Sequence, residues 1–435
     1  DEKDNEQDNK SKNNDRFNAL QYNLINKNQY KPQILLRGIM RVFYAEANYG
    51  NEEIDAVIKV LKEDRLAIMD GKQVHELEKK VANLFRKDFG LMTNSGSSAN
   101  LLGIQGLRLP DQSKVITPAL TFSTTIAPLV QSNLVPLFVD VELDTLQIDT
   151  SLLKDIPLDG VSAICVPNLI GNIANWEEIY SFAKSNNLKI IEDSADTIGY
   201  KYNTNLNDWS DVATTSFYAS HVVTGSGFGG MTAFKDQECY EYAKSLRGWG
   251  RRSSQYGETE DYNRRFDCKI GGYDYDDKYV FDDLGYNFMP SEISAAFAIV
   301  QLSNLENNLQ GRANNFAALS EVFSQSPNFD TFRTYDNVFT GWLAFPMLLT
   351  NKLKGKRKEF QIFLEKAGIQ TRTIFTGNIL KQPVAEKFKW ESHGTFDISD
   401  EIMQNGVMLG CHNQMNEEKM AYMKQKVFEA EAEIA

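Results

Sequence analysis

The stretch LKIIEDSAD, residues 188–196, is short, apolar and rich in isoleucine, and it closes with carboxylates. A run of this kind predicts a buried strand that ends at a functional edge of a sheet. Five similar runs surround it, with helical stretches such as EEIYSFAKSNN (177–187) between them. The runs are KVITPAL (114–120), LVPLFVDV (134–141), AICVPN (163–168), VATTSFY (212–218) and GGMTAF (229–234). This alternation predicts an α/β fold with a largely parallel sheet covered by helices on both faces, and ligands of such sheets lie beyond the carboxyl ends of the strands.

The segments before this core predict a tail, an arm and two helices. Residues 1–16 contain no apolar side chain and predict a disordered tail. Residues 17–45 carry scattered apolar positions, which favour a helix or an arm that packs on the body. Apolar residues at three- and four-residue spacing then predict helices at 54–63 and 75–85.

The segments after the core predict a second domain. SEISAAFAIVQLSNLENNL (291–309) predicts one long buried helix that leads from a large domain, 17–310, to a smaller C-terminal α/β domain, 311–435. Residues 248–280 are predicted to be a loop. The C-terminal domain is predicted to contain helices at 312–323, 356–368 and 417–434 and a strand near 341–350.

Composition excludes several classes of protein. The chain has 435 residues and a formal net charge of −13, which argues against a nucleic-acid binder. No apolar run approaches the length of a membrane span. The four cysteines, Cys165, Cys239, Cys268 and Cys411, form no C-x-x-C pair, so no local zinc or iron–sulfur motif is present. We expect reduced thiols and a cytoplasmic protein.

Three segments carry residues suited to chemistry. In NSGSSANLL (94–102), small residues and hydroxyls precede an apolar helix, which suits a phosphate but also fits an ordinary N-cap. Asp193, at the end of its strand, can pair with a protonated heterocyclic nitrogen or cap the next helix. In TTSFYASHVVTGSGFGG (214–230), Ser216 precedes His221 by five residues, and a lone histidine is more often a structural polar residue than a catalyst.

Together the three segments are far more specific than each alone. Over about residues 45–420 the chain resembles the DegT/DnrJ/EryC1/StrS family of sugar aminotransferases and dehydratases. The further segments that carry the resemblance are TPALTF (117–122), VDVELDTLQID (139–149), PNLIGN (167–172), LGYN (284–287) and SAAFAIVQL (294–302). That family has the fold of type I pyridoxal-phosphate enzymes. The resemblance implies a large domain with a mostly parallel seven-stranded sheet and a smaller C-terminal α/β domain.

The resemblance also implies roles for individual residues. Matched by position, Gly96, Ser97 and Ser216 are the ligands of the cofactor phosphate, and Phe122 is the aromatic residue that stacks on the cofactor ring. Asp193 is the partner of the ring nitrogen, and Asp196 is a neighbour of the ring hydroxyl. Asn287 matches a residue that binds the phosphate in the partner subunit. The last match implies a homodimer with shared active sites.

One departure from the family pattern decides the expected reaction. Aminotransferases of the family read SF-x-x-x-K, and the lysine forms a Schiff base with the cofactor. Here SFYASH places His221 at that position, and no lysine lies between Ser216 and Gly230. Histidine forms no such bond but moves protons near neutral pH. Histidine at this position resembles the 3-dehydratase branch of the family. The segments TRTIFTGNILKQP (371–383) and GWGRR (248–252) resemble that branch as well. Those enzymes use pyridoxamine phosphate to remove the C3 hydroxyl of a nucleotide-linked 4-keto-6-deoxyhexose in dideoxysugar biosynthesis.

The branch contains enzymes with and without a [2Fe–2S] cluster. Only Cys268 lies in the loop that carries the cluster cysteines, so we expect no cluster. We expect glutamate to be the donor that restores the amine form of the cofactor from pyridoxal phosphate.

An arginine that many members carry after Asn287 is missing. Arg251 and Arg372 are candidates to hold a carboxylate or diphosphate of the substrate, and each also fits a structural arginine.

Two alternative functions stay open at this point. The chain can be a pyridoxal-phosphate-dependent nucleotide-sugar aminotransferase with a lysine from elsewhere, or a non-catalytic homologue that binds a sugar nucleotide. Retention of Ser216, Asp193 and Phe122 argues against the non-catalytic reading, because these positions serve only the cofactor.

Overall fold

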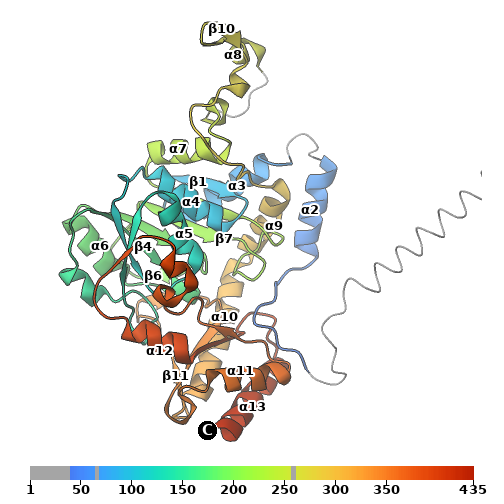
Figure 1. Ribbon diagram of the computed structural model, residues 1–435. Coiled ribbons are helices and arrows are strands. Elements are labelled where there is room, and N and C mark those ends of the chain that lie inside the picture. Colours follow the sequence, from blue (N-terminus) through green and yellow to red (C-terminus); the bar gives the residue numbers. More distant parts are fainter. Residues whose placement is uncertain (1–39, 64–67, 256–260) are drawn as a thin grey trace, which may run out of the picture. The chain divides into compact units, whose positions relative to one another are not determined.

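The computed structural model describes residues 40–63, 68–255 and 261–435 (Figure 1). The predicted tail 1–16 and nearly all of the predicted arm 17–45 lie outside these residues. The two helices predicted next in the sequence are present as α2 (Asn51–Glu63) and α3 (Lys72–Leu84).

The apolar runs all become strands of one sheet, as predicted. The strand order is β1-β8-β7-β5-β4-β2-β3-β15. These strands are β1 (Phe89–Thr93), β2 (Lys114–Pro118), β3 (Val135–Val139), β4 (Val161–Pro167), β5 (Lys189–Asp193), β7 (Val212–Ser216), β8 (Gly230–Phe234) and β15 (Glu391–Ser392). Strands β7, β5, β4, β2 and β3 run parallel to one another, and β8 is antiparallel to both of its neighbours. The prediction of a mostly parallel α/β sheet is therefore confirmed.

The sheet has eight strands instead of the predicted seven. The additional strand, β15, comes from the C-terminal part of the chain and pairs in parallel with β3. It contains only Glu391 and Ser392, which is too short to leave a period-two pattern in the sequence. The count of seven holds for the strands contributed by the large domain.

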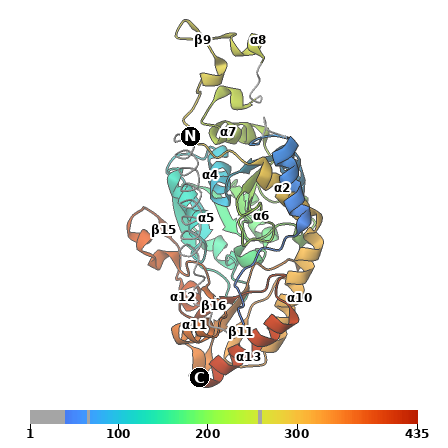
Figure 2. The same ribbon diagram turned by 90° about the vertical axis from the view of Figure 1, so that its right-hand side faces the viewer.

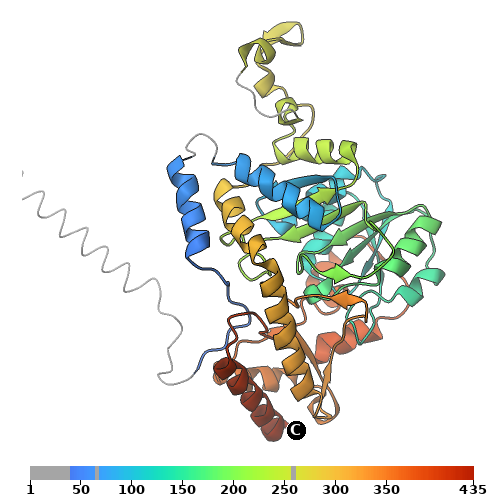
Figure 3. The ribbon, with the colours of Figure 1, turned by 180° about the vertical axis from the view of Figure 1, so that it is seen from behind.

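Helices cover both faces of the sheet (Figures 1 and 3). On one face, α3, α6 (Trp176–Ser185) and α9 (Glu292–Ser303) bury a core that includes Trp176. On the other face, α4 (Gly96–Gly106), α5 (Ser123–Gln131) and α7 (Gln237–Arg247) bury a second core around Phe138 and Phe234. Each face of the parallel strands is therefore removed from water, which explains their continuous apolar runs.

The C-terminal part of the chain builds a second, smaller sheet (Figure 2). Its strand order is β11-β13-β16-β14, and all three pairings are antiparallel. Its elements are α10 (Leu305–Phe323), β11 (Phe329–Thr331), β13 (Phe345–Leu349), α11 (Arg357–Lys366), β14 (Arg372–Thr373), α12 (Asp397–Asn405), β16 (Gly406–Leu409) and α13 (Glu417–Ile434). A further short antiparallel pair joins β12 (Val338–Phe339) of the C-terminal part to β6 (Lys201–Tyr202), which lies between β5 and β7 in the sequence.

The predicted long helix 291–309 is wrong in detail. The chain breaks at Asn304, which has φ −102°, so that α9 ends at Ser303 and α10 begins at Leu305. The helix predicted at 312–323 is the second half of α10. The proposed domain boundary at residue 311 consequently falls inside a helix, and Val42–Ala435 form one compact unit, so the two-domain division stays a prediction.

The predicted loop 248–280 contains regular structure. It holds α8 (Tyr262–Arg265) and a hairpin of β9 (Cys268–Ile270) and β10 (Tyr273–Tyr275), which extends away from the large sheet (Figure 1). Gly271 and Gly272 form the two-residue turn of this hairpin with φ of 58° and 90°, a conformation that glycine adopts without strain. Among the residues described, no helix is both long and apolar enough to cross a lipid bilayer.

We predict that Gly230→Ala lowers the thermal stability. A Cβ built on Gly230 lies 2.4 Å from the backbone carbonyl carbon and oxygen of Ser95, and backbone cannot move aside as a flexible side chain does. Overpacking of this kind costs about 1–3 kcal/mol, which thermal unfolding followed by circular dichroism will report as a lower Tm. Gly50→Ala is the matched control, because a Cβ at Gly50 meets no atom within 4 Å. Equal Tm values for the two variants would contradict this explanation of Gly230.

Candidate active site

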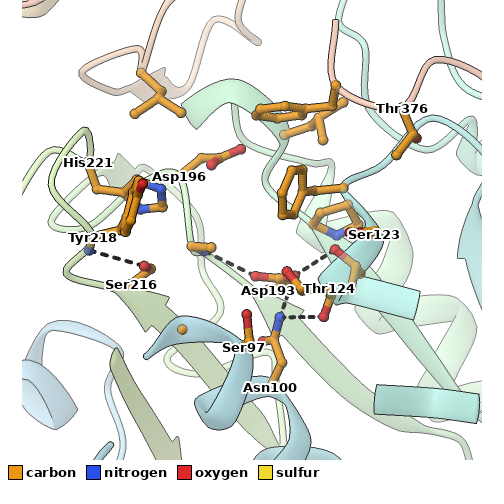
Figure 4. Close-up of a pocket in the computed structure, with 18 of the residues that line it drawn as sticks. Ser97, Asn100, Ser123, Thr124, Asp193, Asp196, Ser216, Tyr218, His221 and Thr376 are labelled. Carbon is orange, nitrogen blue, oxygen red and sulfur yellow. Dashed lines mark hydrogen bonds between the residues drawn. The ribbon is translucent and has the colours of Figure 1, made fainter. Parts of the chain in front are cut away.

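The predicted site residues gather in one cavity of about 780 Å³ at the carboxyl ends of the parallel strands. Segments that directly follow β1, β2, β5 and β7 supply its inner wall, and residues after β14 supply the outer wall. Figure 4 shows several of these side chains directed towards one space. The predicted residues that line it are Gly96, Ser97, Phe122, Asp193, Asp196, Ser216, His221 and Arg372.

One end of the cavity is suited to a phosphate. Ser95 caps α4 by accepting a hydrogen bond from the Ser98 amide at 3.1 Å, so the first amides of the helix face the cavity. A Cβ on Gly96 lies 2.6 Å from Cβ of Ser216, and only glycine lets the helix start this close to the end of β7. Amides at a helix N-terminus next to the hydroxyls of Ser97 and Ser216 form a binding site for an anion.

A buried carboxylate lies at the centre of the cavity floor. Asp193 is 5% exposed. Its Oδ2 accepts hydrogen bonds from Asn100 Nδ2 at 2.9 Å and Thr125 Oγ1 at 2.8 Å, and its Oδ1 accepts one from the Ala195 amide at 3.1 Å (Figure 4). Burial raises the pKa of Asp193, and these hydrogen bonds oppose that rise. Oδ1 keeps acceptor capacity for a further donor from the cavity.

A second carboxyl group, Asp196, lies beside it. Its Oδ2 accepts a hydrogen bond from the Ile170 amide at 2.8 Å. Burial raises the pKa of Asp196 to about 7, with a smaller contribution from the charge of Asp193. This group therefore exchanges a proton near neutral pH.

His221 faces the same space, near Asp196 (Figure 4). A turn after β7 positions it, with the His221 amide donating to the carbonyl of Tyr218 at 3.0 Å. Its Nδ1 is buried and has no hydrogen-bond partner among the described residues. Burial lowers the pKa of His221 to about 4, so the imidazole is neutral at pH 7 and can accept a proton. A buried polar atom without a partner in the protein is suited to pairing with a ligand.

Phe122 lies at the mouth of the cavity, directly before α5. Its ring is 49% exposed and meets Phe375 edge-on, with 5.5 Å between the ring centroids. The ring therefore still offers apolar surface to a ligand. No lysine is among the described residues that line the cavity.

A strap at the start of the described chain adds a residue that sequence reasoning missed. The Val42 amide donates to the carbonyl of Gly368 at 3.0 Å, and the Tyr44 amide donates to Gln370 Oε1 at 3.0 Å. These bonds bring Tyr44 into the cavity wall, where the guanidinium of Arg372 lies 5.4 Å from the centroid of the Tyr44 ring. Burial raises the pKa of Tyr44 well above its ordinary value, so its hydroxyl stays a hydrogen-bond donor.

Asn100 and Thr125 were also missed, although NSGSSANLL contains Asn100. No local pattern marks either residue, because their common partner, Asp193, is distant in the sequence.

Two predicted residues do not line the cavity of their own chain. Arg251 packs over the Trp249 ring at 4.6 Å, which gives no support for a ligand role within its chain. Asn287 is exposed, and its predicted role concerns the partner subunit.

The part of the chain that the structure describes contains no group of three or more His, Cys, Asp or Glu residues placed to hold a metal ion. Cys165 and Cys411 are buried, whereas Cys239 and Cys268 are partly exposed. The expected lack of an iron–sulfur cluster stays a prediction.

Comparisons with known proteins agree with the geometry. Residues 47–428 match the model of the DegT/DnrJ/EryC1/StrS aminotransferase family. The chain is 32% identical over 362 residues to the lipopolysaccharide biosynthesis protein RfbH of Salmonella typhimurium, covering 80% of this chain and 83% of the relative. It is 31% identical to the dTDP-4-dehydro-2,6-dideoxy-D-glucose 3-dehydratase of Saccharopolyspora spinosa, covering 87% and 84%.

Solved structures give the same picture. An E. coli GDP-4-keto-6-deoxy-D-mannose 3-dehydratase with bound hydrated PLP superposes with a TM-score of 0.79 at 27% identity, covering 89% of this chain and 100% of that chain. A second structure, of a GDP-4-keto-6-deoxymannose 3-dehydratase with a trapped PLP–glutamate geminal diamine, has a TM-score of 0.78 at 27% identity and covers 88% and 99%.

We predict that His221 titrates far below an ordinary histidine in the protein without ligands. Nuclear magnetic resonance of labelled histidines should give a midpoint near pH 4 for His221 and one above 6.5 for His75, whose pKa its hydrogen bond with Asp70 raises. Because the unfolded chain binds a proton at about pH 6.5 and folded His221 does not, stability should fall as the pH drops from 6.5 towards 4. His221→Asn assigns the signal and should make this fall shallower. A midpoint at or above 6.5 would show that the imidazole is not desolvated.

Proposed function

We infer that this chain, which belongs to the DegT/DnrJ/EryC1/StrS aminotransferase family, is a 3-dehydratase of a nucleotide-linked 4-keto-6-deoxyhexose in dideoxysugar biosynthesis. Its cofactor is pyridoxamine 5′-phosphate, which alternates with pyridoxal 5′-phosphate. The observation that carries the assignment is His221, which takes the place of the family's Schiff-base lysine in a cavity lined by no described lysine. The aminotransferase alternative needs such a lysine, and no described residue supplies one at the cavity. The non-catalytic alternative leaves the arrangement of Asp193, Ser216 and Gly96 in one cavity without a purpose.

The residues present fit the cofactor. Gly96, Ser97 and Ser216 would hold its phosphate at the start of α4. Asp193, with acceptor capacity left on Oδ1, would hold the protonated ring nitrogen, and Phe122 would cover the ring face. Asp196 would lie beside the ring hydroxyl. When bound, the cofactor supplies an amine that condenses with a ketone and a ring that withdraws electrons from the reacting carbon.

The side chains then share the remaining work. His221, neutral at pH 7, takes a proton from the reacting carbon and gives it to the oxygen of the C3 hydroxyl as that hydroxyl leaves. Asp193 keeps a negative charge against the ring nitrogen, so that the proton stays on this atom. No described lysine lines the cavity, so this part of the chain offers no amine to displace the product. Loss of the C3 oxygen is the net change in the sugar, and the amine form of the cofactor would supply the two electrons by ending as the aldehyde form.

Arg372 and Tyr44 are suited to the charged part of the substrates. The guanidinium and the phenol lie together in the cavity wall, outside the residues that would hold the cofactor. A planar guanidinium binds a diphosphate or a carboxylate with two parallel hydrogen bonds. We therefore assign Arg372 to the nucleotide diphosphate or to the carboxylate of glutamate. The relative trapped with a PLP–glutamate adduct supports glutamate as the amino donor.

We further propose a homodimer with shared active sites in the cytoplasm. Phe228 and Tyr218 line the cavity yet are 70% and 56% exposed, which leaves apolar surface open at its mouth. Asn287 is exposed near the same rim: the next residue, Phe288, accepts a hydrogen bond from the amide of Asn94, which lines the cavity. A second copy covering this mouth would bury the aromatic rings and bring its Asn287 to the phosphate site.

The reaction can be tested directly. Purified protein with pyridoxamine phosphate and a 4-keto-6-deoxy sugar nucleotide should yield a product that has lost its C3 oxygen, as measured by mass spectrometry. His221→Asn should reduce the rate by about 10²–10⁴-fold, the usual contribution of a general acid–base, with cofactor binding retained. His221→Lys should lose dehydration and gain amination at C4. A wild-type product aminated at C4 with its C3 hydroxyl intact would refute the dehydratase assignment.

Shared sites can be tested by mixing two impaired variants. We expect homodimers of His221→Asn and of Asn287→Ala to be weakly active. In a mixed dimer, one site carries both substitutions and the other carries neither, so co-refolding or co-expression should restore activity at about a quarter of all sites if the chains pair at random. If Asn287 serves its own chain, every mixed site carries one substitution and mixing restores nothing. Light scattering on the wild-type protein should give the mass of a dimer.

A further inference from the structure

Among the residues that the structure describes, none forms an ion pair with the carboxylate of Asp193. The ionisable groups that act on it are Glu192 on the same strand, Asp196 in the loop that follows and Cys165 on β4. None of these is a cation. Helices α4 and α5 and strand β7, which also pack against it, contribute neutral donors only. Hydrogen bonds must therefore compensate the burial of this group.

The donors fix where the carboxylate points. Asn100 and Thr125 both donate to Oδ2, at 2.9 and 2.8 Å, whereas Oδ1 receives only the Ala195 amide, at 3.1 Å. The two side chains therefore occupy Oδ2, and Oδ1 is the oxygen with more acceptor capacity left for a donor from the cavity. Asn100 and Thr125 are themselves buried, so their donor groups are held in place by the surrounding protein.

The orientation of the Asn100 amide is fixed as well. Its Nδ2 donates both to Asp193 and to the carbonyl of Thr124, at 3.1 Å, and its Oδ1 accepts from the hydroxyl of Thr214. A flipped amide would place Oδ1 against two acceptors. The two acceptors and the Thr214 donor therefore all favour the orientation in which Asn100 is a donor to the carboxylate.

We propose that Asn100 and Thr125 are positioning residues for the Asp193 carboxylate. By donating to Oδ2, they keep the carboxylate charged and in the orientation that holds a proton on the cofactor ring nitrogen. Thr214 acts indirectly, through its hydrogen bond to Asn100. This inference rests on the proposed function, because it presumes that the cofactor binds in this cavity. It assigns a role to three residues, on α4, α5 and β7, to which the family resemblance gave none.

The test uses the binding and the protonation of the cofactor rather than turnover. Thr125→Val removes the hydroxyl and keeps the shape, and Thr125→Ser keeps the hydroxyl. Calorimetry with pyridoxamine phosphate alone should show binding weaker by about tenfold to hundredfold for Thr125→Val, the effect of one lost hydrogen bond to a charged group. The ¹⁵N shift of ring-labelled pyridoxamine phosphate should show that the bound ring nitrogen loses its proton at lower pH. Thr125→Ser should restore both values.

Two further variants separate positioning from general damage to the fold. Thr232→Val is the matched control: Thr232 is buried and donates to the carbonyl of Ala99 on the same helix α4 at 2.6 Å, but it does not contact Asp193. It should bind like the wild type. Thr214→Val should weaken binding in the same sense as Thr125→Val, because Asn100 Oδ1 then loses its donor and the amide is held less firmly against Asp193. It also provides a second test if Thr125→Val does not fold.

Three results would overturn the inference. Unchanged affinity and unchanged ring protonation in Thr125→Val and Thr214→Val would show that the hydrogen bonds to Asp193 are dispensable. Equal losses in the Thr232→Val control would show that any buried hydroxyl has this effect. Failure of the wild-type protein itself to bind pyridoxamine phosphate would overturn the proposed function, and this inference with it, which distinguishes the two failures.

Discussion

The burial of one negative charge without a cation is the constraint around which the site is arranged. Asp193 ends a central strand of the sheet and is 5% exposed, and a carboxylate buried in this way is tolerated only if protein dipoles surround it. Its donors come from the first turn of α5, from the middle of α4 and from the turn after β5. These are the segments that also carry Phe122 and Gly96. Satisfying the carboxylate thus places the aromatic ring and the phosphate cradle at the same time.

The preceding residue, Glu192, extends this arrangement to the other side of the strand. Successive side chains on a strand point to opposite faces, so the carboxyl group of Glu192 is buried in the core under α6. It accepts hydrogen bonds from five neutral side chains, those of Asn168, Ser194, Tyr200, Trp209 and Ser210. Asn168 begins the turn whose Ile170 amide binds Asp196. Two adjacent carboxyl groups therefore organise the chain on both faces of one strand.

The sequence was sufficient to predict the inner wall of the cavity because parallel strands end at a common edge. Asp193, Ser216 and His221 lie at or after the ends of strands that apolar runs identify, so their meeting is a consequence of the fold. Gly96 follows β1, which no predicted run identified, and it was found from the start of its helix. The family resemblance supplied what the pattern could not, namely the roles of these residues and the importance of the missing lysine.

The rest depends on contacts between distant segments, which leave no local signal. Asn100 and Thr125 are ordinary helix residues until Asp193 is placed between them. The two residues of β15 and the break at Asn304 are set by neighbours in space, because neither has a turn sequence or a periodic pattern of its own. Tyr44 could not be predicted for the same reason, since its position is fixed by Gly368 and Gln370.

The strap that carries Tyr44 also bears on how the protein is made. Its residues are made early among those that the structure describes, but their partners lie far downstream in the chain. Tyr44 needs Gln370, the carbonyl of Phe43 binds His412, and Glu46 pairs with Lys419. A nascent chain can therefore build the large sheet while its substrate wall is still absent. The cavity wall is completed only when residues 42–46 meet the segment from Gly368 to Lys419, so a chain that stops before Gly368 would lack this wall.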